Sequence, residues 1–352
     1  MNISAAQALV KVLLTEGVSH VFCVPGESFL AVLDALGEVK DRITVVTCRH
    51  ESGAANMAAA HGKLTGRPGV CMVTRGPGAT HASVGVHTAR QDSAPMILFV
   101  GQVARAHKGR EAFQEMDYPA MFGSFAKWVT DIDDEHRLAE LVSHGFAMAT
   151  EGRMGPVVIA LPEDMLSKPT ADRPVQRGPE ERRLLSADTL TEITQRLQRA
   201  ERPVMILGGS GWTVAVLEKL SAWIARAQIP VALTFRRKDL IDNDHPCYAG
   251  DLGLGTNPAL IGRIKNADLV LALGTRLGDI ATQGYTLFTP EVTLQKLIHI
   301  HPDPAEIGRI WPCTIGAAAD VNRAADALCD IAWDGRNGSA ATEAHASFEA
   351  FA

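Results

Sequence analysis

Residues 69–102 read GVCMVTRGPGATHASVGVHTARQDSAPMILFVGQ, and this stretch decides the fold. An apolar run over 69–74 leads into a segment rich in glycine and proline, a helical pattern follows over 80–91, and a second apolar run occupies 95–100. Both runs are continuously apolar, which is typical of strands that helices cover on both faces, and such strands belong to parallel sheets. The stretch therefore predicts a strand, a crossover helix and a second, parallel strand.

The same alternation continues on both sides of this stretch. Further strands are predicted at 18–24, 43–48 and 156–161, and further helices at 29–39, 52–64 and 136–150. This order predicts a layered α/β domain over residues 1–166.

A second domain follows a break in the pattern. Residues 167–185 are rich in proline and charge and predict a linker. The alternation resumes over 186–333, with strands predicted at 204–207, 231–235, 269–273 and 296–300, and helices at 190–199, 214–227, 258–265 and 321–331. Residues 334–352 are rich in Gly, Ala, Ser and Glu, and they predict a tail or linker. The fold class is therefore α/β, with two successive doubly wound parallel-sheet domains.

The bulk composition limits the classes of function. The 352 residues carry a formal net charge of −6 and no basic run, which argues against nucleic acid as a partner. No apolar stretch reaches the roughly 18 residues of a membrane span. The N-terminal segment lacks the pattern of a signal peptide, so we expect a cytoplasmic protein without a membrane partner.

Four loops after predicted strands carry unusual residues, and loops at the carboxyl ends of strands are where α/β sheets bind ligands. These loops are Pro25–Ser28, Arg49–Gly53, Thr74–His81 and a longer one that includes Phe113–Glu115. Each has a structural explanation when taken alone. Pro-Gly is a turn signal, and a carboxylate such as Glu51 suits the start of a helix. Their occurrence on successive strand ends favours a ligand site.

The residues in these loops resemble a known family. RHESGAANMAAAHGKLTG (49–66), VTRGPGATHASVGVHTARQDSAPMILFVGQV (73–103), AFQEMD (112–117) and GRMGPVVIALPEDM (152–165) resemble the pyrimidine-binding domain of thiamine-diphosphate-dependent enzymes of the acetolactate synthase type. The similarity continues more weakly to about residue 308. The resemblance implies that the first domain binds the pyrimidine ring of thiamine diphosphate.

The resemblance implies a role for each matching residue. Glu51 would contact the ring nitrogen of the pyrimidine, and Gln114 would face the reacting carbon and a bound 2-keto acid. The other implied cofactor contacts are Pro25, Gly26, Thr74, Gly76, Pro77, His81 and Phe113. His81 departs from the family, whose members commonly carry asparagine there, but it keeps the capacity to form hydrogen bonds.

The second domain resembles the central domain of the family, which holds FAD in acetolactate synthases. The candidate FAD contacts are Arg153, Gly208, Gly209, Gly274 and Arg276. His301 stands where relatives carry an aspartate near the nucleotide, so FAD binding stays an open alternative to an empty domain. His299 and His301 have a spacing that can bind a metal, but without a third ligand we expect no metal site in the chain.

A third domain holds the diphosphate through Mg²⁺ in this family, with a Gly-Asp-Gly motif. Residues 250–252 and 278–280 carry only the Gly-Asp dipeptide, in the wrong context. We therefore expect a truncated product or one piece of a split enzyme that pairs with a separate diphosphate-binding chain. Because the family's active site forms across a dimer, this chain alone is expected to bind the cofactor weakly and to be inactive.

The resemblance implies a carboligase that acts on pyruvate and other 2-keto acids, in branched-chain amino acid biosynthesis, as a homodimer or tetramer. One alternative is another thiamine-diphosphate-dependent decarboxylase or oxidase of 2-keto acids. The other is a non-catalytic binding or assembly fragment.

Overall fold

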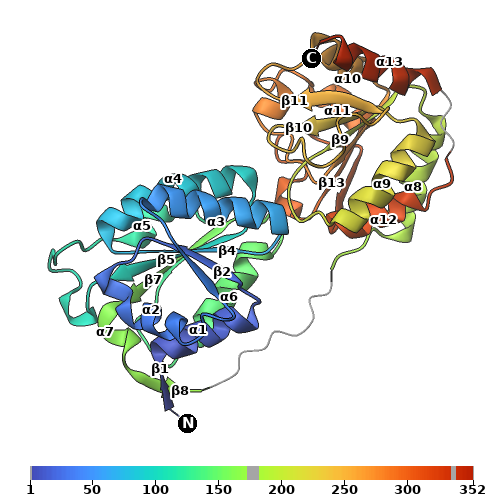
Figure 1. The fold of residues 1–352 in the computed structure, drawn as a ribbon. Coiled ribbons are helices and arrows are strands. Elements are labelled where there is room, and N and C mark those ends of the chain that lie inside the picture. Colours follow the sequence, from blue (N-terminus) through green and yellow to red (C-terminus); the bar gives the residue numbers. More distant parts are fainter. Residues whose placement is uncertain (1, 173–181, 334–337, 352) are drawn as a thin grey trace. The chain divides into compact units, whose positions relative to one another are not determined.

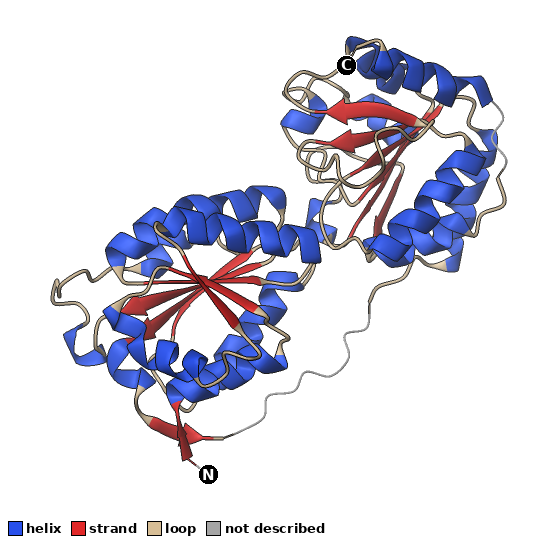
Figure 2. Cartoon of the chain, viewed as in Figure 1, coloured by secondary structure: helices blue, strands red, loops and turns tan. Residues whose placement is uncertain are grey.

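The computed structural model describes residues 2–172, 182–333 and 338–351, and the chain divides into two compact units, Met1–Glu180 and Glu181–Ala352 (Figure 1). Each unit is built on a six-stranded sheet with helices on both faces (Figure 2). All strand pairs in the two sheets are parallel. This confirms the predicted α/β class with two parallel-sheet domains.

The sheet of the first unit has the order β3-β2-β4-β5-β7-β6. Its strands are β2 (His20–Cys23), β3 (Thr44–Thr47), β4 (Gly69–Val73), β5 (Met96–Gln102), β6 (Trp128–Asp131) and β7 (Pro156–Pro162). Its helices are α1 (Ala5–Thr15), α2 (Leu30–Gly37), α3 (Glu51–Thr65), α4 (Gly76–Asp92), α5 (Tyr118–Phe122), α6 (Leu138–Thr150) and α7 (Glu163–Leu166). Helices α3 and α4 cover one face and α1, α2 and α6 the other (Figure 1), so two apolar cores form, one on each side of the sheet.

Three strands of the first unit lie outside the predicted ones. Strand β6 pairs with β7 at the edge of the sheet, where its residues are only half-buried. Strand β1 (Asn2–Ser4) pairs antiparallel with β8 (Pro169–Ala171). Strand β8 lies within the stretch predicted as a linker, whose residues 173–181 are outside the described part of the chain.

The sheet of the second unit has the order β11-β10-β9-β12-β13-β14. Its strands are β9 (Pro203–Leu207), β10 (Val231–Thr234), β11 (Tyr248–Leu252), β12 (Leu269–Leu273), β13 (Leu297–His301) and β14 (Ile315–Ala318). Its helices are α8 (Ala187–Arg199), α9 (Val214–Ala227), α10 (Pro258–Asn266), α11 (Pro290–Lys296), α12 (Val321–Cys329) and α13 (Gly338–Glu349). Across the described ranges of the chain, no helix combines the length and the apolar character needed to cross a bilayer.

Helix α13 occupies a segment whose composition predicts a tail or linker. Ala341 and Ala344 are buried, the ring of His345 contacts the carbonyl of Tyr248 at 3.0 Å, and the rings of Phe348 and Tyr248 meet edge to face at 4.8 Å. Positions 341, 344, 345 and 348 follow the i, i+3, i+4, i+7 pattern, which places these four residues on one face of the helix. Residues 338–349, within the segment predicted as a tail or linker, therefore form a helix that packs against β11, and the small residues of this segment conceal its short apolar stripe.

A buried cation closes helix α10. The Nζ atom of Lys296 donates hydrogen bonds to the carbonyls of Ile264, Lys265 and Ala267, at 2.9–3.1 Å. Carbonyls at the last turn of a helix have no partners within the helix, and a cation at that end is favourable. Lys296 is therefore a structural residue that joins α10 to the start of β13.

Candidate functional site

The topology of the first sheet creates a switch point between β2 and β4. The chain passes from β2 to β3 on one side and then returns to β4 on the other, so the loops after β2 and β4 leave in opposite directions. Such a crevice at the carboxyl ends of strands is the usual ligand site of open parallel sheets. The loop residues Pro25 and Gly26, and Thr74, Gly76 and Pro77, therefore lie where the sequence predicts a ligand site.

The two loops touch each other at this switch point. A Cβ atom added to Gly26 would lie 2.6 Å from Cβ of Thr74, which is closer than real side chains approach. The hydroxyl groups of Ser28 and Thr74 are 3.1 Å apart and share a hydrogen bond. Glycine at position 26 is therefore required by the close approach of the loops, whatever ligand they hold.

Arg75 holds the same loops in place through ion pairs. Its side chain is 10% exposed and forms ion pairs with Glu163 and, at 3.8 Å, with Glu27. Its Nε atom is buried and has no hydrogen-bond partner among the described residues. The sequence analysis assigned Arg75 no role, because its partners lie far away in the chain.

Glu51 is the first residue of α3 and points to α4. The Oε2 atom of Glu51 lies 3.0 Å from Nδ1 of His81, and the Glu51 side chain is 14% exposed. The ring of His50, which precedes the helix, lies 4.7 Å from the ring of His81 between centroids. The structure thus brings together two predicted site residues, Glu51 and His81, and adds His50 to them.

The loop with Phe113 and Gln114 is attached to the start of α4. The backbone N–H of Gly76 donates to the carbonyl of Gln114 at 3.0 Å, and Gln114 has a φ of 65°. The Glu115 carboxylate accepts hydrogen bonds from the backbone N–H groups of Gly109 and Ala112, which lower the pKa of Glu115. The side chain of Phe113 is left 75% exposed.

The second sheet has its own switch point, between β9 and β12. The backbones of Gly208 and Gly209 after β9 pack against Gly274 after β12, so that a Cβ atom on Gly209 would overlap the carbonyl of Gly274. Gly209 and Gly274 both have positive φ values, 71° and 75°. Three of the predicted FAD contacts therefore meet at one place, at the edge where a doubly wound sheet binds nucleotides.

Three side chains, one from the loop itself and two from distant parts of the unit, donate hydrogen bonds to the carbonyls of the loop after β9. The indole of Trp212 donates to the carbonyl of Gly208 at 2.9 Å, and the guanidinium of Arg237 donates to that of Gly209. The amide of Asn322, on α12, donates to the carbonyl of Gly211 at 2.8 Å. These contacts fix the loop shape, and the sequence analysis singled out none of the three donors.

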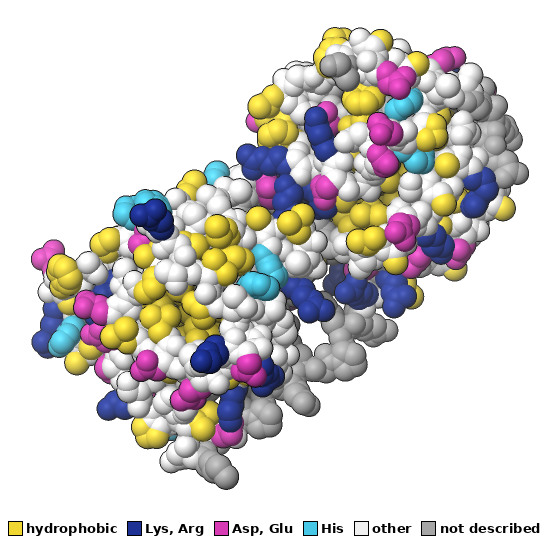
Figure 3. All heavy atoms as spheres, in the orientation of Figure 1, with side chains coloured by type: hydrophobic (Ala, Val, Ile, Leu, Met, Phe, Trp, Pro, Cys, Tyr) yellow, Lys and Arg dark blue, Asp and Glu magenta, His cyan; other side chains and the backbone are white. Residues whose placement is uncertain are grey.

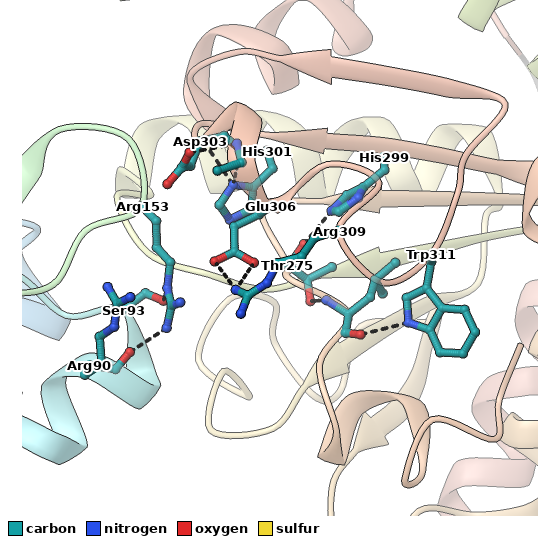
Figure 4. A network of polar contacts seen from close by, with 12 residues as sticks. Arg90, Ser93, Arg153, Thr275, His299, His301, Asp303, Glu306, Arg309 and Trp311 are labelled. Atoms are coloured by element: carbon teal, nitrogen blue, oxygen red, sulfur yellow. Dashed lines mark hydrogen bonds and ion pairs between the residues drawn. The ribbon is translucent and has the colours of Figure 1, made fainter. Parts of the chain in front are cut away.

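Arg153 and Arg276, the other predicted FAD contacts, lie in different units. In the first unit the buried Arg153 donates to the Ser93 hydroxyl at 3.0 Å and to the carbonyl of Arg90 at 2.7 Å, so it closes the end of α4 (Figure 4). Arg276 is half-buried in the second unit, directly after Gly274 and Thr275. Arg153 and the glycine cluster thus belong to different units, and Arg276 follows Gly274 by two positions in the chain.

Two buried histidines end strand β13 (Figure 4). His299 contacts the carbonyl of Thr275 through Nε2 at 2.8 Å, and His301 accepts the backbone N–H of Asp303 at 3.0 Å. Burial lowers the pKa of His299, and burial together with the neighbouring His299 lowers the pKa of His301 to about 4. Both rings are therefore neutral at pH 7, and strand β13 carries two uncharged imidazoles near its carboxyl end.

Comparisons with known proteins agree with this geometry. The family model "Thiamine pyrophosphate enzyme, N-terminal TPP binding domain" matches residues 3–121, and "Thiamine pyrophosphate enzyme, central domain" matches residues 190–328. The chain is similar to the acetolactate synthase isozyme 2 large subunit of Escherichia coli, with 30% identity over 325 residues that cover 92% of the chain and 58% of that protein.

Two other relatives show the same partial coverage. A probable acetolactate synthase large subunit of Methanocaldococcus jannaschii is 34% identical over 86% of the chain and 52% of its own length. A putative thiamine pyrophosphate-containing protein, YdaP, of Bacillus subtilis is 31% identical over 90% of the chain and 54% of its own length. The chain thus spans a little over half the length of these curated relatives.

The depressed pKa of His301 predicts an acid-sensitive second unit. Its folded-state pKa of about 4 lies below the ordinary value of 6.5, so its contribution to stability is complete above pH 6.5 and is lost as the pH falls toward 4. Between pH 7 and pH 5 the free energy of unfolding of this unit should fall by about 2 kcal/mol through His301 alone. In His301→Asn, which keeps a hydrogen-bond acceptor, this share of the loss should disappear.

Urea unfolding followed by tryptophan fluorescence measures this difference, because four of the five tryptophans lie in the second unit, at positions 212, 223, 311 and 333. His345→Asn, in the same unit, is the control and should keep the pH dependence. An unchanged pH dependence in His301→Asn would contradict the assignment.

Proposed function

The chain belongs to the thiamine pyrophosphate enzyme family, and on that premise we propose that it is part of a carboligase of the acetolactate synthase type that acts on pyruvate or a related 2-keto acid. The observation that carries the proposal is Glu51 at the start of α3, next to the switch point of the first sheet and held by His81. The similarity to acetolactate synthase large subunits over about nine-tenths of the chain supports the carboligase over other reactions of the family.

The residues at this edge fit the pyrimidine ring of thiamine diphosphate. A flat aromatic ring needs apolar faces and a few polar groups at its rim, and Pro25, Pro77 and Phe113 present exposed apolar surface on three neighbouring loops. Glu51 supplies a carboxylate whose Oε2 atom is engaged by His81, while no contact to Oε1 is found among the described residues. Oε1 is the atom that we assign to the ring nitrogen.

Thiamine diphosphate, when bound, supplies the electron sink that allows a bond to a carbonyl carbon to be broken and another to be formed. In this proposal Glu51 shares a proton with the ring nitrogen of the pyrimidine. Enclosure of the carboxylate strengthens that hydrogen bond, because competing water is largely excluded. Gln114, fixed by the bond between its carbonyl and Gly76, orients the 2-keto acid.

We propose that the diphosphate and its Mg²⁺ are held outside these two units. The relatives are longer than the matched part of the chain, and Mg²⁺ bound to phosphate takes several oxygen ligands. These oxygen ligands would come from a counterpart of the part of the relatives that the chain does not match. That counterpart would lie on the same polypeptide or on a separate chain.

A prediction on thiamine diphosphate binding tests the pyrimidine site. Thiamine diphosphate should bind to the chain weakly and saturably, and Glu51→Gln should weaken binding by about tenfold, because the amide cannot share a proton as the carboxyl group does. Isothermal titration of the purified chain measures both affinities. Glu140→Gln, a change of an exposed carboxylate on α6, is the matched control and should bind like the unchanged chain. Equal affinities for all three proteins would contradict the role of Glu51.

The second unit is proposed to hold the phosphate end of FAD. Gly208, Gly209 and Gly274 let two loops meet at the switch point, and successive N–H groups around left-handed glycines form concavities for anions. Quenching of FAD fluorescence should be saturable for the unchanged chain and lost in Gly209→Ala, whose added methyl group would force the loop away from Gly274. Gly262→Ala, on the open surface of α10, should quench as the unchanged chain does. Absence of saturable quenching would sink the proposal.

An oligomer, a dimer or tetramer, is also proposed, from the surface of α3 and α4. Met57 is 48% exposed, Leu64 77% and Val84 50%, and Figure 3 shows hydrophobic side chains gathered on the visible face of the first unit. Exposed apolar surface of this kind marks protein contacts. Light scattering should give at least twice the mass of one chain, and Met57→Lys with Val84→Lys should shift it toward a monomer. Leu254→Lys, in the second unit, should leave the measured mass unchanged. A monomer at every concentration would refute the proposal.

A further inference from the structure

Two imidazoles and one carboxylate meet where α3 and α4 begin. One ligand atom from each of His50, Glu51 and His81 lies within 4.8 Å of the other two. The imidazoles are exposed, whereas the carboxylate between them is largely enclosed. No other group of three histidine, cysteine or acidic side chains meets this criterion in the described part of the chain.

We propose that His50, Glu51 and His81 form a binding site for a divalent transition-metal ion of the zinc class. Two imidazoles and one carboxylate are a recurrent ligand set of open zinc sites, which keep a fourth position for water. Imidazole selects zinc, copper or nickel over Mg²⁺ and Ca²⁺, which prefer oxygen ligands. This ion would be distinct from the Mg²⁺ that accompanies a diphosphate.

The spacing of the ligand atoms suits such an ion. Ligands bound tetrahedrally to zinc at about 2.0–2.1 Å lie about 3.3 Å apart, and Nδ1 of His81 is 3.0 Å from Oε2 of Glu51. These two atoms thus need to separate only slightly to admit the ion between them. The third ligand, on His50, has to approach, and its ring is exposed and already lies 4.7 Å from the ring of His81 between centroids.

The contacts of His50 leave one nitrogen for the metal. Nδ1 of His50 lies 2.8 Å from the hydroxyl oxygen of Ser52 and 3.2 Å from the Ser52 backbone nitrogen. In the structure Nδ1 accepts the Ser52 backbone N–H, so binding of the ion through Nε2 moves the ring proton to Nδ1. Nδ1 then donates to the Ser52 hydroxyl and gives up the contact with the Ser52 backbone N–H. A metal-bound histidine usually donates its second nitrogen in this way, and the contact fixes the orientation of the ring.

Metal binding would block the carboxylate that the pyrimidine site uses. This consequence rests on the proposed function, because the ion and the cofactor ring would compete for Glu51. The binding itself does not depend on that function. A zinc-class ion would therefore act as a reversible inhibitor of cofactor binding at this site.

Titration of the chelator-treated chain with Zn²⁺, without thiamine diphosphate, tests the site directly. The unchanged chain should show a site with a stoichiometry of one. His81→Asn, His50→Asn and Glu51→Gln should each weaken it by about tenfold or more, since even loss of an outer contact to a metal ligand costs that much. Asn at position 50 preserves the cap of α3, so each variant should fold, as circular dichroism can verify.

His107→Asn, which changes an exposed histidine in the loop after β5, is the matched control and should bind Zn²⁺ as the unchanged chain does. Co²⁺ in place of Zn²⁺ should give a visible absorption band that the three ligand variants lack. Binding that is absent, or equal in the unchanged chain and the three variants, would overturn the proposal. Because this titration contains no thiamine diphosphate, its outcome is independent of the test of the pyrimidine site.

Discussion

Close packing around glycine residues at the carboxyl edge of each sheet is the constraint on which both units depend. In the first unit Gly26 lies against Thr74, and a Cβ atom on Gly101 would overlap the Ser28 side chain. In the second, Gly209 and Gly274 approach so closely that neither has room for a side chain. Because these contacts hold the loops in place, the side chains of neighbouring residues are free to face a ligand. The parallel sheets bring the loops to one edge, and the glycines allow the loops to approach each other closely.

The sequence predicts the central strands well and the edges poorly. Central strands such as β4 and β5 are buried on both faces, so their residues form continuous apolar runs that are easily recognised. The edge strand β6 is half-buried and reads WVTD, and β11 contains Gly250 with a φ of 115°, so neither has a clear strand pattern. The order of the strands in each sheet, which creates the switch points, is set by tertiary packing and is not written in any local motif.

The same division applies to the candidate site. The unusual loops identified Glu51 and His81 separately, and the structure brings them into contact across 30 positions of the chain. The supporting residues were missed, because their partners are remote: Arg75 pairs with a residue 88 positions away, and Asn322 holds a loop 111 positions away. Whether a polar residue supports a loop depends on such contacts, which leave no spacing pattern in the sequence.

The buried histidines change the chemistry that the second unit offers. His301 is neutral at pH 7 since its pKa is about 4, and His299 shifts in the same direction. Among the nearby carboxylates, Glu306 is buried and pairs with Arg309 at 3.2 Å, and Asp303 accepts the backbone N–H of Ala305 at 2.9 Å. A neutral imidazole cannot offer the two acceptor oxygens with which an acidic residue grips ribose hydroxyls. A nucleotide at this edge would therefore be held mainly through its phosphates, at the glycine loops, and less through its sugar.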